Sequence, residues 1–315
     1  MSARIAESTA MNTLSLLLIA LILDAVLGEP DWLWNRFPHP ATLMGRCVEW
    51  LDGHLNHGKK RRNAGILATI ILTLGALILS LVIKSIPDAG VLEAILAAIL
   101  LAQRSLTDHV SQVAEALRSS LAEGRRAVSM IVGRDPAELD ESAISRAAIE
   151  SAAENFSDGI IAPAFWFLIF GLPGIVMYKI INTADSMIGH RNERYEDFGW
   201  AAARLDDIVN WVPARLTGGL ICLAHWSKAG WETMQADAKH HRSPNAGWPE
   251  AAMAGVLGIA ISGPRSYNGI MTKLPWVNGS GRKPLGPVDI ETSVRVLWRS
   301  WFVGVGILAT VWMIF

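Results

Sequence analysis

The 315-residue sequence has little charge and almost no cysteine. Only 18% of its residues are charged and the net charge is −1, so the chain lacks the basic excess with which proteins bind nucleic acids, and we expect no nucleic-acid partner. Its two cysteines, Cys47 and Cys222, lie far apart and form no CxxC pair, which argues against a disulfide framework and against a zinc site.

Common nucleotide-binding and nucleophile motifs are also missing. The sequence contains no G-x-G-x-x-G, G-x-S-x-G or H-E-x-x-H pattern. The segment Gly53–Lys60 (GHLNHGKK) matches a P-loop only in part, because Lys60 stands where a Ser or Thr would hold Mg²⁺ and no strand is expected before it. We therefore expect any nucleotide to bind through Mg²⁺ and arginine side chains.

Apolar residues, by contrast, are abundant and gather in blocks. They make up 51% of the chain, and the mean hydropathy is +0.30. Ala64–Ile83 has the length of about 20 residues that crosses a bilayer, and Met11–Leu27 and Val296–Phe315 come close to it. The thirteen Trp residues are typical of the interface between membrane and water. We predict an all-α, multi-pass integral membrane protein with a single domain over residues 1–315.

The distribution of Lys and Arg predicts which loops face the cytoplasm. The basic loop around Lys59 places the first loop inside and both termini outside, with about four full spans. Those spans are Met11–Leu27, Ala64–Ile83, Val91–Gln103 and Val296–Phe315. The polar segments on the cytoplasmic face are 28–63, 104–158, 182–210, 228–250 and 264–290. Within the second of these, Gly133 should end one helix and Pro136 should begin the next.

One apolar run is broken rather than continuous. Gly159–Tyr178 contains Pro163 and the sequence GLPG at Gly171–Gly174, and the two pieces are each too short to cross a bilayer. Broken backbone at membrane depth is tolerated only where protein or a wet cavity covers it. We therefore predict a re-entrant helical hairpin that returns the chain to the cytoplasmic side.

Carboxylate and amide side chains recur at helical spacing in the polar segments, where residues three or four apart share a helix face. The rows are Glu154, Asn155 and Asp158; Asn182, Asp185 and Ser186; and Asp206, Asp207 and Asn210. Mg²⁺ in enzymes is held by a few carboxylates together with substrate phosphates and water. Because carboxylates at a membrane boundary are costly and usually functional, these rows predict a magnesium–phosphate site.

Arginines are interleaved with these acids, and the set consists of Arg191, Arg194, Arg204 and Arg215. They can bind the phosphates of a nucleotide, or they can pair with the acids and brace loops at the membrane surface. The residues alone leave both interpretations open. His240 and His241 lack the spacing of a metal-binding pair, and the SPNAG sequence that follows them reads as a turn.

At these motifs the sequence resembles a known family. DAVLGEP, ESAAENFSDGIIAP, NTADSMIGHRNERYEDFGWAAARLDDIVNWVPARL and SPNAGWPEAAMAG are similar to the signature blocks of the CobD/CbiB membrane proteins of cobalamin biosynthesis. The resemblance covers nearly the whole chain. It implies an adenosylcobinamide-phosphate synthase in the bacterial inner membrane, with its active site facing the cytoplasm. Such an enzyme uses ATP and Mg²⁺ to join adenosylcobyric acid to (R)-1-aminopropan-2-ol or its O-phosphate, and it can associate with other membrane enzymes of the late pathway.

Within these motifs we assign roles as predictions. The catalytic residues are Asp185, Arg191, Arg204, Arg215 and Glu154. The residues that bind ATP or another cofactor are Arg194, Asn245, His241 and Asn155. The metal ligands are Asp206, Asp207, Asn210 and Asp158. Adjacent helix residues point about 100° apart, so Asp206 and Asp207 should differ, and Asp207 should share a face with Arg204 and Asn210. We therefore favour Asp206 for direct coordination.

Two other interpretations fit parts of the pattern. The sequence DDIVN resembles the metal boxes of enzymes that transfer prenyl groups, which predicts a membrane transferase, although no second D-x-x-x-D box is present. A non-catalytic membrane sensor of the AmpE type would instead tolerate substitutions at Asp185, Asp206 and Asp207.

Overall fold

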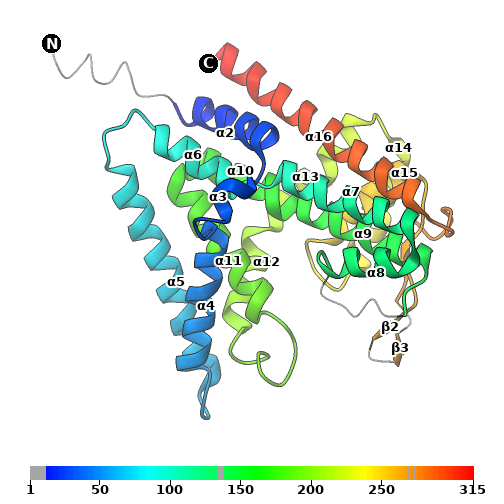
Figure 1. The fold of residues 1–315 in the computed structure, drawn as a ribbon, viewed down its shortest axis with the longest axis horizontal. Coiled ribbons are helices and arrows are strands. Elements are labelled where there is room, and N and C mark those ends of the chain that lie inside the picture. The colour runs from blue at the N-terminus through cyan, green and yellow to red at the C-terminus, as the bar shows by residue number, and fades with distance from the viewer. Residues whose placement is uncertain (1–11, 133–137, 268–269, 273) are drawn as a thin grey trace. The chain divides into compact units, whose positions relative to one another are not determined.

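A computed structural model of the chain describes residues 12–132, 138–267, 270–272 and 274–315 (Figure 1). The described residues are mainly helical, as predicted, with four short strands as the exception. They form two compact units. The first comprises Met1–Arg104, Ala162–Asn210 and Leu308–Phe315, and the second comprises Ser105–Ile161 and Trp211–Ile307. The single membrane domain expected from the sequence stays a prediction.

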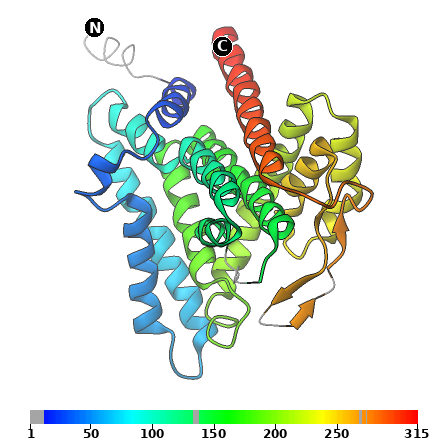
Figure 2. The ribbon, with the colours of Figure 1, turned by 45° about the vertical axis from the view of Figure 1, so that its right-hand side comes forward.

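The first unit is built around one central helix. Its helices are α2 (Thr13–Leu27), α3 (Asp31–Trp34), α4 (Pro40–Leu55), α5 (Arg61–Lys84), α6 (Val91–Leu100), α10 (Ala162–Phe170), α11 (Leu172–Ile188) and α12 (Trp200–Val209). Helix α11 contacts α4, α5, α10 and α12, while α2 packs on α6. Figure 2 shows α4 and α5 side by side, in blue and cyan, running antiparallel across a short turn. Because α11 has neighbours on several sides, Asp185, near its end, lies among other helices.

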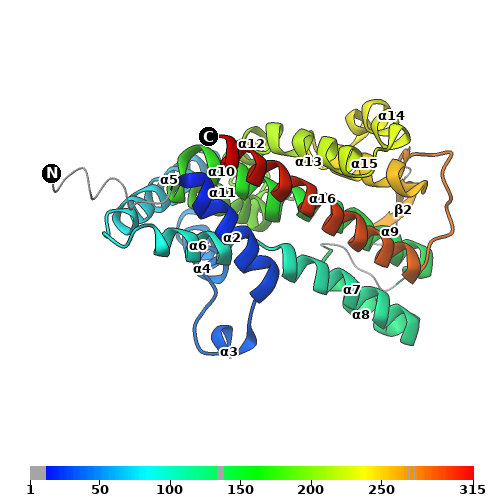
Figure 3. The same ribbon diagram turned by 90° about the horizontal axis from the view of Figure 1, so that it is seen from above.

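The second unit gathers helices of the middle and end of the chain. They are α7 (Gln103–Ser119) from its third residue on, α8 (Leu121–Ser129), α9 (Glu141–Phe156), the π-helix η1 (Ser157–Ile161), α13 (Trp211–Ala224), α14 (Lys228–Asp237), the 3-10 helix η2 (Ala238–His240), α15 (Gly247–Leu257) and α16 (Pro287–Ile314) as far as Ile307. Helix α15 contacts α9, α13 and α14, and Figure 3 shows α13, α14 and α15 as neighbours. The strands form two antiparallel pairs, β1 (Ile261–Ser262) with β4 (Trp276–Val277) and β2 (Arg265–Tyr267) with β3 (Ile270–Thr272).

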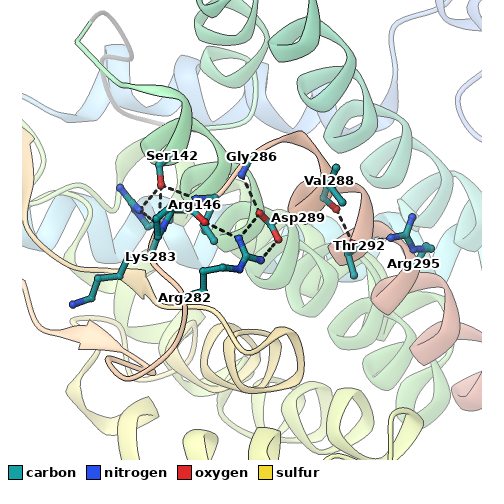
Figure 4. Close-up of polar contacts among 11 residues, drawn as sticks. Ser142, Arg146, Arg282, Lys283, Gly286, Val288, Asp289, Thr292 and Arg295 are labelled. Atoms are coloured by element: carbon teal, nitrogen blue, oxygen red, sulfur yellow. Dashed lines mark hydrogen bonds and ion pairs between the residues drawn. The ribbon is translucent and has the colours of Figure 1, made fainter.

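A polar network anchors the beginning of α16 (Figure 4). The Arg282 guanidinium pairs with the Asp289 carboxylate at 2.5 Å, and that carboxylate also accepts the backbone N–H of Gly286 at 3.0 Å. Ser142 and Arg146, on α9, both donate to the backbone carbonyl of Lys283, at 2.9 and 3.0 Å. These bonds fix the point at which the long C-terminal helix starts.

Two helices among the described residues, α5 and α16, are long and apolar enough to cross a membrane. They correspond to the predicted spans Ala64–Ile83 and Val296–Phe315. The other two predicted spans come out shorter, as the fifteen-residue α2 and the ten-residue α6. At about 1.5 Å per residue, these helices fall short of the roughly 30 Å hydrocarbon core. Among the described residues, therefore, two of the four expected spans have the length needed to cross a bilayer.

The broken run does form a helical hairpin. Helices α10 and α11 pack together and are joined at Gly171, whose φ of 64° lies in the region that favours glycine. A Cβ on Gly174 would collide with the backbone carbonyl of Trp166, so the close approach of the two helices requires glycine there. The second arm is longer than predicted, because α11 continues through Asn182 to Ile188. Its re-entrant position in a membrane stays a prediction.

Two further local predictions have different outcomes. The predicted helix break at Gly133–Pro136 lies outside the described residues, and the helix that follows begins at Glu141, with the Asp140 side chain accepting the backbone N–H of Ala143. The segment Gly53–Lys60 begins inside the helix α4 rather than after a strand, which agrees with its rejection as a P-loop.

Candidate functional site

The facing helices α11 and α12 bring one set of predicted site residues together. Asp206, on α12, is 9% exposed, and both of its carboxylate oxygens accept hydrogen bonds from amides. Asn182, on α11, donates to Oδ1 at 3.3 Å, and Asn210 donates to Oδ2 at 3.0 Å. The Tyr178 hydroxyl donates to the Asn210 side-chain oxygen at 2.9 Å, which turns the amide nitrogen of Asn210 toward Asp206. These four side chains form a continuous hydrogen-bonded chain that holds the carboxylate in place.

Besides burial, a second carboxylate, that of Asp185 on α11, raises the pKa of the Asp206 carboxylate through its negative charge. Burial raises the pKa of Asp206 to about 7, the negative charge of Asp185 adds to this, and the two asparagine hydrogen bonds oppose it. The pKa of Asp185 is itself raised, by burial first and by the charge of Asp207 second, while His190 acts in the opposite direction. The two facing acids therefore repel each other, and a cation between them would relieve that repulsion.

Asp207, although adjacent, has a different environment. It is half-buried and lies 3.8 Å from the exposed Arg204 guanidinium, one turn back on α12. Burial raises the pKa of Asp207, and the charges of Arg204 and Arg191 oppose that effect. The predicted pairing of Asp207 with Arg204 is confirmed. The expectation that Asn210 shares a face with Asp207 is wrong, because the Asn210 amide donates to Asp206 instead. That the two acids play unequal parts in binding a metal stays a prediction.

These groups suit Mg²⁺ in part. Among the described residues no group of three or more His, Cys, Asp or Glu side chains is arranged to hold a metal ion. Mg²⁺ that binds through substrate phosphates needs only one or two carboxylates and keeps several waters. The pair Asp185 and Asp206 supplies that number, so the site fits Mg²⁺ bound together with a phosphate and does not fit an all-protein metal cage.

Arg194 has a partner that the sequence did not suggest. Its guanidinium is 2.5 Å from the buried carboxylate of Asp52 on α4. The same carboxylate accepts hydrogen bonds from Asn56 at 2.7 Å and from the Tyr195 hydroxyl at 3.3 Å. Arg61 also donates to the backbone carbonyl of Arg194 at 3.4 Å. This network ties the loop between α11 and α12 to α4, which is the bracing role that the sequence left open for the arginines.

The acids before the hairpin belong to the second unit. Glu154 and Asn155 are exposed near the end of α9, and the Asn155 amide donates back to the Ser151 carbonyl at 2.9 Å. Asp158 lies in η1, whose wider π turn replaces the α-helical geometry that the spacing of Glu154 and Asp158 assumed. The predicted row on one α-helical face is therefore wrong at Asp158. The π-helix packs on α13, the helix that carries Arg215.

His241 and Asn245 lie around the predicted turn, in the second unit. The His241 Nε2 is 3.7 Å from the buried carboxylate of Glu250, and its Nδ1 accepts the backbone N–H of Ser243 at 3.1 Å. The Ser243 hydroxyl in turn accepts the backbone N–H of Asn245 at 3.2 Å. The turn is confirmed, and the predicted cofactor-binding role of these two side chains stays a prediction.

Sequence reasoning missed the role of three residues at these sites, namely Tyr178, Asp52 and Tyr195, and it named Asn182 only as a member of a polar row. Tyr178 and Asn182 are four residues apart on α11, as are Asn182 and Ser186, so their shared face was visible in the spacing. The pairing of Asp52 with Arg194 joins residues 142 positions apart, and no local pattern indicates it.

Together these features define a mainly helical protein with two helices of membrane-spanning length and an acidic, amide-rich site between two facing helices. The comparison with protein families identifies it further. The model of the CobD/Cbib protein family matches residues 17–297, and the chain belongs to that family.

Relatives of high identity carry one name. The chain is 50% identical to the "Cobalamin biosynthesis protein CobD" of Brucella suis biovar 1 over 305 residues, covering 91% of this chain and 93% of that protein. It is 49% identical to the protein of the same name from Rhizobium meliloti, with the same coverage, and 45% identical to that of Rhodobacter capsulatus over 96% of this chain and all of the relative. No solved structure matches the chain.

Proposed function

We propose that the protein acts in cobalamin biosynthesis as an ATP- and Mg²⁺-dependent amide ligase. Its substrates would be the carboxylate of adenosylcobyric acid and the amine of (R)-1-aminopropan-2-ol or its O-phosphate. The names of its relatives support a role in cobalamin biosynthesis. The observation that carries the ligase chemistry is the Asp206 carboxylate, fixed by Asn182 and Asn210 beside the second acid Asp185.

The reaction class follows from the substrates. A carboxylate and an amine do not condense in water unless the carboxylate is activated, most simply as an acyl phosphate. One carboxylate oxygen attacks the γ-phosphorus of ATP and ADP leaves; the amine then attacks the acyl carbon and phosphate leaves. Phosphoryl transfer depends on positioning and charge neutralisation more than on covalent help from the protein. A site made of acids, amides and arginines is suited to that task.

Mg²⁺ fits the proposed site through Asp206 and Asp185, with Asn210 and Asn182 holding Asp206 in position. When bound, the ion supplies positive charge that neutralises the phosphates of ATP. Asp207 would then take the supporting part, because Arg204 already offsets its charge. Arg191 and Arg204 are exposed beside this site and are our candidates for contacting phosphate oxygens.

The remaining predicted residues keep the roles that the sequence suggests. Arg194 is engaged with Asp52, so binding ATP would require it to exchange partners. Glu154, Asn155, Asp158, His241 and Asn245 belong to the second unit, together with Arg215. We propose that Glu154 and Arg215 are catalytic, that Asp158 is a metal ligand, and that Asn155, His241 and Asn245 bind ATP. The enzyme would work at the cytoplasmic face of the inner membrane, in contact with the bilayer and with other enzymes of the pathway.

The test is a reaction with defined components. Purified protein is incubated with adenosylcobyric acid, Mg·ATP, and either the amino alcohol or its phosphate, and the products are identified by mass spectrometry. We expect the mass of the amide, with ADP rather than AMP as the second product. Formation of amide without ATP, or release of pyrophosphate, would refute the acyl-phosphate route.

A further inference from the structure

Arg215 occupies an unusual position in the second unit. Its guanidinium carbon lies 4.2 Å from the ring centre of Trp211, one turn back on α13, and 4.4 Å from the ring centre of Trp248 on α15. A cation this close to an aromatic face is attracted by the ring quadrupole. Contact with two rings therefore fixes the position of the guanidinium more firmly than one would.

The two rings and the guanidinium between them, called the clamp below, are held in place by neighbouring residues. Helices α13 and α15 approach closely at Gly218, where a Cβ would lie 3.0 Å from the backbone carbonyl oxygen of Trp248. The Trp248 ring is held by a hydrogen bond from its Nε1 to the Pro244 carbonyl at 3.2 Å. The Trp211 ring is 54% exposed, so one side of the clamp remains open.

The charge of this arginine has no counter-ion in the part of the chain that the structure describes. No Asp or Glu pairs with Arg215 there, in contrast to Arg118, Arg194, Arg204 and Arg282. Of its five N–H donors, Nη1 donates to the Trp211 carbonyl at 2.6 Å. The half-buried guanidinium therefore presents further donors in a fixed fork without a neutralising acid.

We propose that Arg215, clamped between Trp211 and Trp248, is a binding site for a phosphate group. The planar fork of a guanidinium matches two oxygens of one anion. A phosphate monoester carries about −1.5 to −2 charges at pH 7, so it neutralises an unpaired cation more fully than a carboxylate does. The source is either a soluble phosphate compound or a lipid headgroup, since the neighbouring Val212 and Leu216 expose apolar side chains.

Binding can be measured without any reaction, and so independently of the proposed ligase activity. The full chain, purified in a maltoside detergent that contains no phosphate, is titrated by calorimetry with inorganic pyrophosphate in EDTA, which removes divalent metal from the acidic site. A second titration uses dioctanoyl phosphatidic acid as the lipid probe. We expect saturable binding of at least one probe and much weaker binding of acetate.

The variants decide whether Arg215 is responsible. Arg215→Gln should abolish the binding, and Arg215→Lys, which keeps the charge but loses the fork, should weaken it by about tenfold or more. Trp211→Leu, at an exposed position, should weaken it as well. Arg118→Gln is the matched control, because it removes the same charge from an arginine that already pairs with Glu291, and it should bind like wild type.

The two probes show which compound supplies the phosphate group. Saturation by pyrophosphate supports a soluble phosphate ligand, and saturation by phosphatidic acid alone supports a lipid headgroup. The proposal is overturned if folded Arg215→Lys and Trp211→Leu proteins bind both probes as wild type does, if acetate binds as tightly as they do, or if neither probe saturates wild type.

Discussion

At the scale of single residues, the protonation of Asp206 would link the proposed metal binding to the stability of the fold. In the folded protein the pKa of Asp206 is raised from 3.8 to about 7. Between pH 4 and pH 7 the folded state therefore holds more protons than the unfolded state, so this group's contribution to stability falls as the pH rises through that window. Above pH 7 the Asp206 carboxylate becomes ionised in the metal-free protein, next to the charge of Asp185.

Asp206→Asn removes one of those charges while keeping the shape of the side chain. At pH 8 without metal, we expect the variant to unfold at or above the wild-type temperature. Mg²⁺ should raise the unfolding temperature of wild type and have little effect on the variant. Differential scanning fluorimetry in detergent, with and without Mg²⁺, measures both. An equal Mg²⁺-induced shift in the two proteins would place the ion elsewhere.

Tyr178 offers a second test at this scale, because its hydroxyl donates to the Asn210 side chain, which in turn holds Asp206. Tyr178→Phe deletes the hydroxyl that orients the Asn210 amide, a bond worth about 1 kcal/mol. We expect the Mg²⁺ concentration for half-maximal activity to rise by roughly fivefold, with a smaller change in maximal rate. Tyr195→Phe is the matched control, since its hydroxyl contacts Asp52 instead. If both variants respond to Mg²⁺ alike, the orienting role of Tyr178 is wrong.

At the scale of secondary-structure elements, the hairpin of α10 and α11 supports one side of the site. The Trp166 indole N–H donates to the Val209 carbonyl at 3.0 Å, at the end of α12 and next to Asn210. Gly174, in contact with the Trp166 backbone, sets the distance between the hairpin arms. A change at Gly174 should therefore displace the end of α12 as well as the hairpin.

Gly174→Ala should lower the free energy of unfolding by about 1–3 kcal/mol, the usual cost of overpacking, and should reduce activity too. Gly75→Ala is the control, since a Cβ at Gly75 in α5 meets no atom within 4 Å. Thermal unfolding and ligase activity are measured on both. Wild-type stability and activity in Gly174→Ala would show that the helices can separate without consequence.

The elements also show what local sequence predicts and what it does not. The turn at Gly171, the helix of Ala64–Ile83 and the C-terminal helix follow from glycine placement and apolar length. The shortness of α6 does not, because its apolar run continues through Leu101, where the backbone becomes extended. The π-helix at Ser157–Ile161 likewise has no signal in helical spacing, which is why Asp158 was misplaced.

The same distinction applies to the candidate site. Asp206, Asp207, Asn210 and Arg204 are close in sequence, so their spacing alone predicted that the two acids would differ. The partner of Arg194 and the two-tryptophan clamp on Arg215 depend on helices that meet only after folding. Local patterns therefore indicate the candidate site residues. Tertiary packing decides which arginine pairs with an acid and which one lacks an acidic partner among the described residues.

At the scale of the whole molecule, the membrane topology is open to a direct test. The Lys and Arg distribution predicts cytoplasmic loops at Lys59, Arg126, Arg194 and Lys239, with both termini outside. Single cysteines at these positions, in a chain whose exposed Cys47 and buried Cys222 are replaced, should react with an impermeant maleimide only after the membrane is opened. Cysteines at the termini should react in intact cells. Labelling of position 194 from outside would refute the re-entrant hairpin.

The central claim is that the acids between α11 and α12 support ATP-driven amide formation. The most direct measurement is the yield of amide and ADP from adenosylcobyric acid, the amine and Mg·ATP, compared between wild type and Asp206→Asn. We predict one ADP per amide in wild type and a loss of at least about a hundredfold in the variant, partly restored by raised Mg²⁺. A Lys59→Ala, Lys60→Ala double variant should stay active. A fully active Asp206→Asn protein, or a folded wild type that forms no amide, would contradict the account.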